Sequence, residues 1–146
     1  MTKTIALIAD KHFKSGIHLN QPASITEINK LEQTIGFLLP KDFKEFYLTC
    51  DGFTCIEDTF KFTSLSVIYS NTSNFGKHWF YFSEYRNYHD MWGLRLTSSG
   101  KYEIFNGSCP EQAITSSLQE FLTTFLKGHV FANGGLYEWE EDLGIR

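Results

Sequence analysis

Two adjacent amphipathic segments in the first third of the chain constrain the fold more than any other feature. In the first, Ser24 and Glu27 have the spacing of a capping box, in which each side chain accepts a hydrogen bond from a backbone N–H that the first helical turn leaves unpaired. Gly36 stands where a left-handed C-terminal cap is favoured. The sequence therefore predicts a helix from Ser24 to Gly36, with an apolar stripe made of Ile25, Ile28, Leu31 and Ile35.

A second helix is predicted directly after this one. Pro40 suits a first helical position, because its fixed φ angle is helical and its missing N–H would be unpaired there anyway. Asp51 and Gly52 end the segment. Between them, apolar residues recur at the i, i+3, i+4 and i+7 positions of one helical face: Phe43, Phe46, Tyr47 and Cys50. The two helices are joined by an apolar linker at residues 37–39.

Beyond residue 52 the apolar residues mostly alternate, which is the period of half-buried strands. Strands are predicted at residues 60–63, 65–69, 78–83, 92–96 and 102–105, with a polar loop at 70–76 and a five-residue hairpin loop at 97–101. Ser117 and Glu120 then form a capping box at the start of a helix that ends at Gly128. The order helix, helix, strands, helix predicts an α+β fold: an antiparallel, possibly mixed, sheet with helices packed mainly on one face.

The helical pair resembles the N-terminal signature of the SUKH superfamily. The motifs that carry the resemblance are Ile35-Gly36, Leu39-Pro40, Phe43 three residues later, and Asp51-Gly52. The resemblance continues to about Gly128 through residues 93–96, 100–105 and 117–122, which occur in the expected order. Where many relatives carry a Gly-rich polar turn before the central hairpin, this chain has residues 88–92 instead. The resemblance implies the same α+β architecture and a role as a bacterial immunity protein or a regulator of the yeast cell-wall-synthesis type.

The length and composition are those of one domain. The chain has 146 residues, and we expect a single SUKH-like domain over residues 1–146, with a core at about 23–128, a lead-in before it and an acidic tail at residues 134–142. Its 14 Phe, 7 Tyr and 3 Trp predict an aromatic core. The apolar run at residues 5–9 is too short for a signal peptide or a membrane span, so we expect a cytoplasmic protein.

Motifs for catalysis and metal binding are absent from the sequence. It contains no GxGxxG, phosphate-binding loop, GxSxG or HExxH. The three cysteines, Cys50, Cys55 and Cys109, are odd in number and lack the spacing of a zinc site, which favours reduced, mostly buried thiols. A pair of Cys109 with His89 is the remaining candidate for nucleophilic chemistry. The sequence thus predicts no metal, no cofactor and no enzymatic activity.

Charge is distributed unevenly along the chain. Residues 1–50 carry six basic and five acidic side chains, whereas residues 51–146 carry seven basic and twelve acidic ones. This excess of acid disfavours nucleic acid as a direct partner, because binding phosphates needs a basic stripe, and it favours a basic protein partner. We therefore expect partner-binding residues where large rings and acids mix, about half of the rings being buried. The candidates are Trp79, Tyr81, Glu84, Tyr85, Tyr88, Trp92, Glu138, Glu140, Glu141 and Asp142.

These observations favour a stoichiometric binding protein that docks on a basic toxin domain, with no membrane partner. The role as an immunity protein is implied by the resemblance to the SUKH superfamily. The residues themselves indicate an acidic binding protein with exposed rings. A regulatory scaffold unrelated to toxins is the first alternative, and a small-ligand enzyme is the second.

Overall fold

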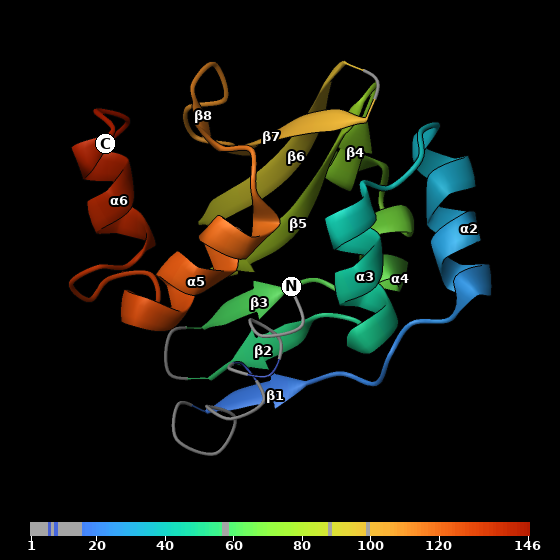
Figure 1. The fold of residues 1–146 in the computed structure, drawn as a ribbon, viewed down its shortest axis with the longest axis horizontal. Coiled ribbons are helices and arrows are strands. Elements are labelled where there is room, and N and C mark those ends of the chain that lie inside the picture. The colour runs from blue at the N-terminus through green and yellow to red at the C-terminus, as the bar shows by residue number, and fades with distance from the viewer. Residues whose placement is uncertain (1–5, 7, 9–15, 57–58, 88, 99) are drawn as a thin grey trace.

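The protein is built as a layer of helices on one sheet (Figure 1). The computed structural model describes residues 6, 8, 16–56, 59–87, 89–98 and 100–146. Within these ranges eight strands form a single sheet in the order β1-β2-β3-β5-β6-β7-β8, and β4 pairs with β5 beside that path. Every pair is antiparallel. The predicted α+β class is confirmed, and the sheet is antiparallel rather than mixed.

The helical pair forms as predicted. Helix α2 spans Ile25–Ile35 and begins with the full capping box between Ser24 and Glu27. It ends at Gly36, whose left-handed φ of 84° is unfavourable for residues with a side chain. Helix α3 spans Lys41–Thr49, and Pro40 lies one position before its first residue. The linker is fastened to α2, because the backbone N–H of Leu39 donates to the Glu32 carboxylate at 2.7 Å.

The strands are mostly where alternation predicts them. Their bounds are Ile17–Leu19 (β1), Phe53–Cys55 (β2), Phe60–Phe62 (β3), Phe75–Gly76 (β4), Trp79–Tyr85 (β5), Asp90–Ser98 (β6), Lys101–Asn106 (β7) and Ala113–Thr115 (β8). The predicted central hairpin is β6 and β7, but its loop is shorter than the five residues expected. Four strands of two or three residues were not predicted: β1, β2, β4 and β8, of which β4 lies at the end of the predicted polar loop.

One predicted strand is wrong. Residues Leu65–Tyr69 form helix α4, not a strand. Leu65 and Ile68 are buried while Val67 is exposed, which is the helical period. The N-terminus of α4 is held by Asp51, whose carboxylate accepts a hydrogen bond from the Leu65 N–H at 2.9 Å. A segment of five residues with Ser66 as its one polar member fits both periods, and the hydrogen bond to Asp51 favours the helix. A short 3-10 helix at Thr72–Asn74 follows α4, inside the predicted loop.

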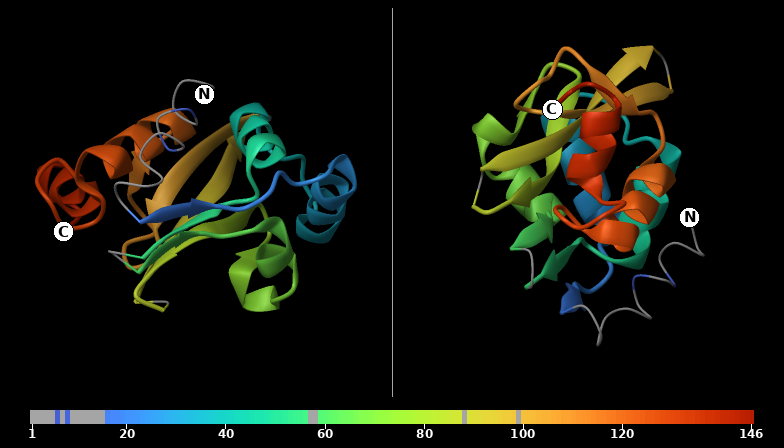
Figure 2. Two further views of the ribbon diagram at one scale, coloured as in Figure 1. Left: turned by 90° about the horizontal axis from the view of Figure 1, so that it is seen from below. Right: turned by 90° about the vertical axis from the view of Figure 1, so that its left-hand side faces the viewer.

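Two helices complete the chain. Helix α5 spans Leu118–Gly128 with Ser117 as its N-cap, although Glu120 accepts from the Thr115 hydroxyl instead of closing the predicted capping box. The acidic tail forms helix α6, Leu136–Asp142. Figure 2 shows α3 and α5 on one face of the sheet, with α2 beside α3 and α6 beside α5. This arrangement agrees with the predicted placement of helices mainly on one face.

Aromatic rings from the helices and strands meet in the core. Phe43 of α3 lies edge-on to Phe82 of β5, with ring centroids 5.1 Å apart. Phe46 of α3 lies 4.3 Å from Phe62 of β3. At the other end of the helix layer, Phe125 of α5 stacks on Phe60 of β3, with ring centroids 4.3 Å apart. Such ring pairs contribute to stability beyond the area that they bury. The predicted aromatic core is therefore confirmed.

Replacing Phe46 with Ala tests the weight of this contact. Phe46 is fully buried, so its loss leaves a cavity, and the free energy of unfolding should fall by about 3–5 kcal/mol. Leu38 is 78% exposed and serves as the control, because Leu38→Ala should change the free energy of unfolding by less than about 0.5 kcal/mol. Urea unfolding measures both values. Equal effects of the two substitutions would contradict a core that depends on Phe46.

Candidate functional site

The candidate partner-binding residues separate into distinct places in the fold. Trp79 and Tyr81 lie on the face of the sheet away from α3 and α5, where their rings meet edge-on at 5.0 Å. Phe105 of β7 joins them, 6.0 Å from Tyr81. The Phe105 ring packs closely on Gly93, because a Cβ added at Gly93 would lie 2.6 Å from that ring. We call these three residues, Trp79, Tyr81 and Phe105, the outer ring cluster. Phe105 was not among the predicted partner-binding residues.

The outer ring cluster borders a cavity of about 340 Å³, and no Asp or Glu is among the described residues that line it. The cationic and imidazole side chains that line it are Lys77, His78 and Arg95. Arg95 lies 4.9 Å from the centroid of the Phe105 ring and pairs with Glu103 at 3.0 Å. Rings are therefore present on this face, but the acids expected beside them are elsewhere.

Tyr85 and Trp92 belong to the core, not to the surface. They are 2% and 0% exposed, so the prediction that they belong to an exposed partner-binding surface is wrong. A bulge in β5 between Tyr81 and Ser83 explains the error. It reverses the alternation, so that Tyr81 and Tyr85 point to opposite faces although they are four residues apart. Glu84 is also buried, near Lys61 at 3.9 Å. Tyr88 lies outside the described residues.

Glu140 is buried in a polar cluster that fastens α6 to the sheet. It is 1% exposed, and it accepts hydrogen bonds from Trp92 Nε1 at 3.3 Å and from Asn106 Nδ2 at 2.9 Å. A second buried carboxylate, Asp90 at the start of β6, accepts from Ser108 Oγ at 2.8 Å, from the Tyr137 hydroxyl, and from Arg146 at 2.9 Å. The Arg146 guanidinium also lies 3.6 Å from the Tyr137 ring centroid. Tyr137 and Glu140 of α6 are thus bonded to residues of β6 and β7.

The two carboxylates of this cluster have opposite pKa shifts. Burial tends to raise the pKa of Asp90, but hydrogen bonds from Tyr137 and Ser108 and the charge of Arg146 hold it below its usual value. Burial raises the pKa of Glu140, and the hydrogen bonds from Asn106 and Trp92 and the charge of Arg146 do not fully compensate. Both residues line a cavity of about 320 Å³.

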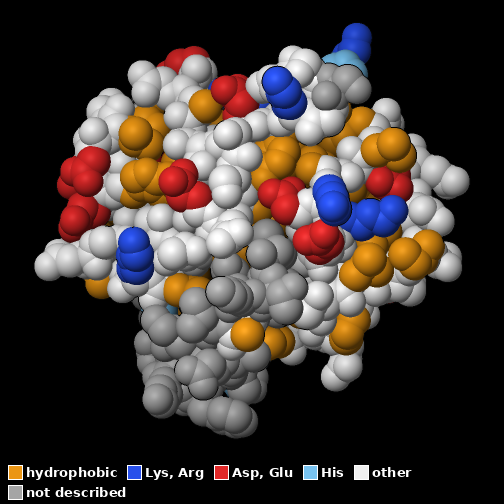
Figure 3. All heavy atoms as spheres, in the orientation of Figure 1, with side chains coloured by type: hydrophobic (Ala, Val, Ile, Leu, Met, Phe, Trp, Pro, Cys, Tyr) orange, Lys and Arg blue, Asp and Glu red, His pale blue; other side chains and the backbone are white. Residues whose placement is uncertain are grey.

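The remaining acids of the tail are exposed on the outer side of α6. Glu138, Glu141 and Asp142 are all exposed, and acidic side chains gather at the edge of the molecule where α6 lies (Figure 3). Trp139, on the same helix, is only partly buried. The tail therefore combines exposed acid with a partly exposed ring, as the sequence analysis expected of a binding surface. Trp139 was not among the predicted partner-binding residues.

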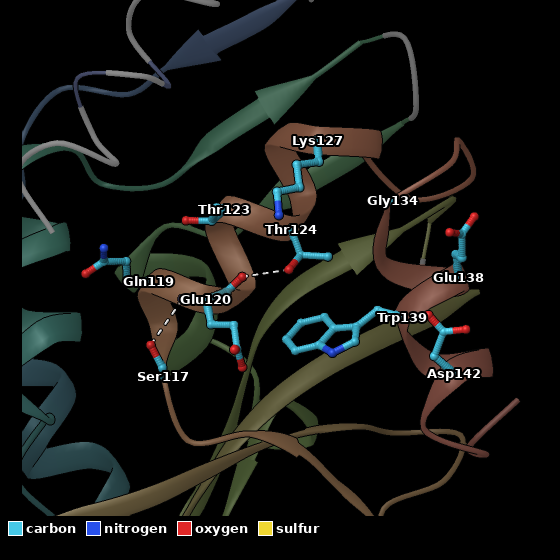
Figure 4. Close-up of a pocket in the computed structure, with 10 residues that line it drawn as sticks. All are labelled: Ser117, Gln119, Glu120, Thr123, Thr124, Lys127, Gly134, Glu138, Trp139 and Asp142. Atoms are coloured by element: carbon cyan, nitrogen blue, oxygen red, sulfur yellow. Dashed lines mark hydrogen bonds between the residues drawn. The ribbon is translucent and has the colours of Figure 1, made fainter.

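A groove of about 550 Å³ runs between α5 and α6 (Figure 4). The indole of Trp139 extends from α6 toward α5, and Glu120 lies on the opposite wall. The remaining lining is polar or charged and includes Thr123, Thr124, Lys127, Glu138 and Asp142. Three carboxylates and one ammonium group thus line the groove together with one indole. We call this feature the α5–α6 groove.

The thiols have the environment of structural cysteines. Cys50 and Cys55 are buried, and burial raises the pKa of the Cys50 thiol to about 12. Cys109 lines the same cavity as His89, but a hydrogen bond to Glu111 raises the pKa of its thiol, which disfavours the nucleophilic thiolate. Among the described residues, no three His, Cys, Asp or Glu side chains are arranged to hold a metal ion.

A family match agrees with this architecture. Residues 22–124, more than half of the chain, match the model of the SMI1 / KNR4 family (SUKH-1). The chain belongs to this SUKH family. The family includes immunity proteins and SMI1/KNR4 regulators, is generally non-enzymatic, and acts through protein–protein interaction.

The family match ends within α5, so α6 and its acids follow the matched residues. No curated protein matches the sequence. In the part of the chain that the structure describes, none of the helices has the length and apolar character needed to cross a membrane.

Replacing Asp90 with Asn tests the polar cluster. Because the folded pKa of Asp90 is depressed, its ionised form contributes stability above the unfolded value of about 4, and that contribution is lost as the pH falls through the folded pKa. The substitution should therefore lower the free energy of unfolding at pH 7 by about 1.5–3 kcal/mol, and by less at pH 3. Urea unfolding at both pH values measures this difference.

The exposed Glu141 on α6 supplies the control for this prediction, because Glu141→Gln should leave the stability at both pH values within about 0.5 kcal/mol of the parent. A destabilisation by Asp90→Asn of the same size at pH 3 and pH 7 would contradict the role of the ionised carboxylate.

Proposed function

We propose that this protein is a non-enzymatic immunity protein that binds a secreted bacterial polymorphic or contact-dependent toxin stoichiometrically, in the cytoplasm, and neutralises it. Membership of a SUKH family that includes immunity proteins supports this function. The observation that carries it is the surface of α6, on which Glu138, Glu141 and Asp142 are exposed beside Trp139. Such a surface is complementary to a basic toxin domain.

The acids and the ring have separate roles in this proposal. Exposed carboxylates attract a basic partner over a distance of about one Debye length and so raise the association rate. A large ring at the contact slows dissociation, because tryptophan is among the residues that dominate binding energy at interfaces. Since Glu140 is buried and bonded to Trp92 and Asn106, it supports the helix and does not contact the partner.

Co-expression with a toxin tests the function itself. The product of a neighbouring gene that encodes a large exported toxin should stop growth of a bacterial host when expressed alone, and growth should recover when this chain is co-expressed. Gel filtration should then show a one-to-one complex. If toxins encoded beside the gene neither bind the chain nor are neutralised by it, the proposal fails.

The regulatory members of the family support a second function, in which the chain binds a signalling protein without any toxin. The same surface of α6 would serve that role. Co-expression distinguishes the two functions, because only an immunity protein restores growth in the presence of a toxin.

The charges on α6 give a kinetic prediction for the complex. Changing Glu138 and Glu141 to Gln and Asp142 to Asn together should slow association with a basic toxin about tenfold at low salt, and raising the salt concentration should reduce the difference. The dissociation rate should change much less. Stopped-flow mixing at several salt concentrations measures both rates.

The exposed Glu45 of α3 supplies the control for this experiment, because Glu45→Gln removes an acid from a different helix. An association rate that responds neither to salt nor to the three substitutions on α6 would place the interface elsewhere, for example on the outer ring cluster.

A further inference from the structure

The α5–α6 groove differs from the other acidic surfaces of the molecule, because it is concave and has a ring inside. Glu141 lies only on the exposed outer side of α6, whereas Glu138 and Asp142 are exposed and also line the groove. In the groove, the Trp139 indole reaches from α6 into a space of about 550 Å³, opposite the carboxylate of Glu120 (Figure 4). This combination can hold a particular side chain.

The geometry of the groove walls is fixed by hydrogen bonds. On α5, the Thr115 hydroxyl donates to the Glu120 carboxylate at 2.6 Å, and Ser117 caps the first turn through the Glu120 N–H at 3.1 Å. On the other wall, α6 is bonded to the sheet through Tyr137 and Glu140. Both walls are therefore preorganised, which lowers the entropy that a ligand loses on binding.

The charge of the groove selects a cation. Glu120, Glu138 and Asp142 line it together with one ammonium group, that of Lys127. A cation above an indole face gains a further attraction from the ring. Among protein side chains, arginine fits both features best, because its planar guanidinium stacks on rings and donates to carboxylates in pairs.

From these contacts we infer that the α5–α6 groove is a receptor for an arginine side chain of the protein partner, with Trp139 beneath the guanidinium and Glu120, across the groove from the indole, as its carboxylate partner. Asp142, on the α6 side, adds negative charge to the groove. The inference rests on the proposed function for the partner being a basic protein. The site itself can be tested without that partner.

The probe for this test is N-acetyl-arginine methylamide, and the signal is the indole N–H resonance of Trp139 in an NMR spectrum of the full chain. Trp139→Phe identifies that resonance among the three tryptophans. The probe should shift it with a dissociation constant on the order of 1–10 mM. The matched citrulline compound, which has nearly the same shape and no charge, should leave it in place.

Two substitutions at exposed side chains give opposite expected effects and do not depend on how well Trp139→Phe folds. Asp142→Asn removes an attractive charge and should weaken binding of the probe about two- to fivefold. Lys127→Gln removes a repulsive charge and should strengthen it by a similar factor.

The inference is overturned if the citrulline compound shifts the Trp139 resonance as much as the arginine compound does, if Lys127→Gln weakens binding, or if the probe shifts only the Trp79 resonance. A toxin that binds the chain while the probe leaves Trp139 unmoved would refute the groove and keep the proposed function. Binding of the probe with no toxin neutralised would refute the function and keep the groove.

Discussion

The contact of α3 with the strands is the constraint on which the rest of the structure depends. Phe43 and Phe46, one helical turn apart, insert among the rings of β3 and β5 and are fully buried. The Tyr47 hydroxyl adds a hydrogen bond to the carbonyl of Thr63 at 2.9 Å, next to β3. Once α3 is placed in this way, the opposite face of the sheet is left to the outer ring cluster, and α5 and α6 cover the space beside α3 (Figure 2).

The local features of the fold could be predicted from the sequence, because their causes are local. The capping box of Ser24 and Glu27 and the left-handed position of Gly36 depend on residues within one or two turns. Helix α4 could not be predicted in this way, because its N-terminal hydrogen bond comes from Asp51, fourteen residues earlier. The strands β1 and β2 are paired segments of three residues, and their pairing is a tertiary effect that no short window contains.

The candidate site shows the same limit more clearly. A single extra residue in β5 places Tyr81 on the outer face and Tyr85 in the core, and nothing in the sequence marks the bulge. Counting alternate positions from Trp79 therefore gives the right face for Tyr81 and the wrong one for Tyr85. In the tail, the three exposed acids were predictable as a charged surface, whereas Glu140 was not separable from them. Only the folded structure shows that the Glu140 carboxylate is buried and accepts hydrogen bonds from Trp92 and Asn106.

The way α6 is held determines what happens when it is released. The helix has seven residues, and isolated helices shorter than about 12–15 residues are marginal in water. Its helical form therefore depends on its bonds to β6, β7 and the C-terminal Arg146, through Tyr137, Glu140 and Asp90. Loss of these contacts would not let α6 swing outward as a rigid lid. The segment would unravel instead, and the array of charges on its outer side would disperse with it. The acidic surface is therefore ordered only while α6 is attached to the sheet, and detachment and unfolding of α6 are one equilibrium. Amide hydrogen exchange within residues 136–142 measures it.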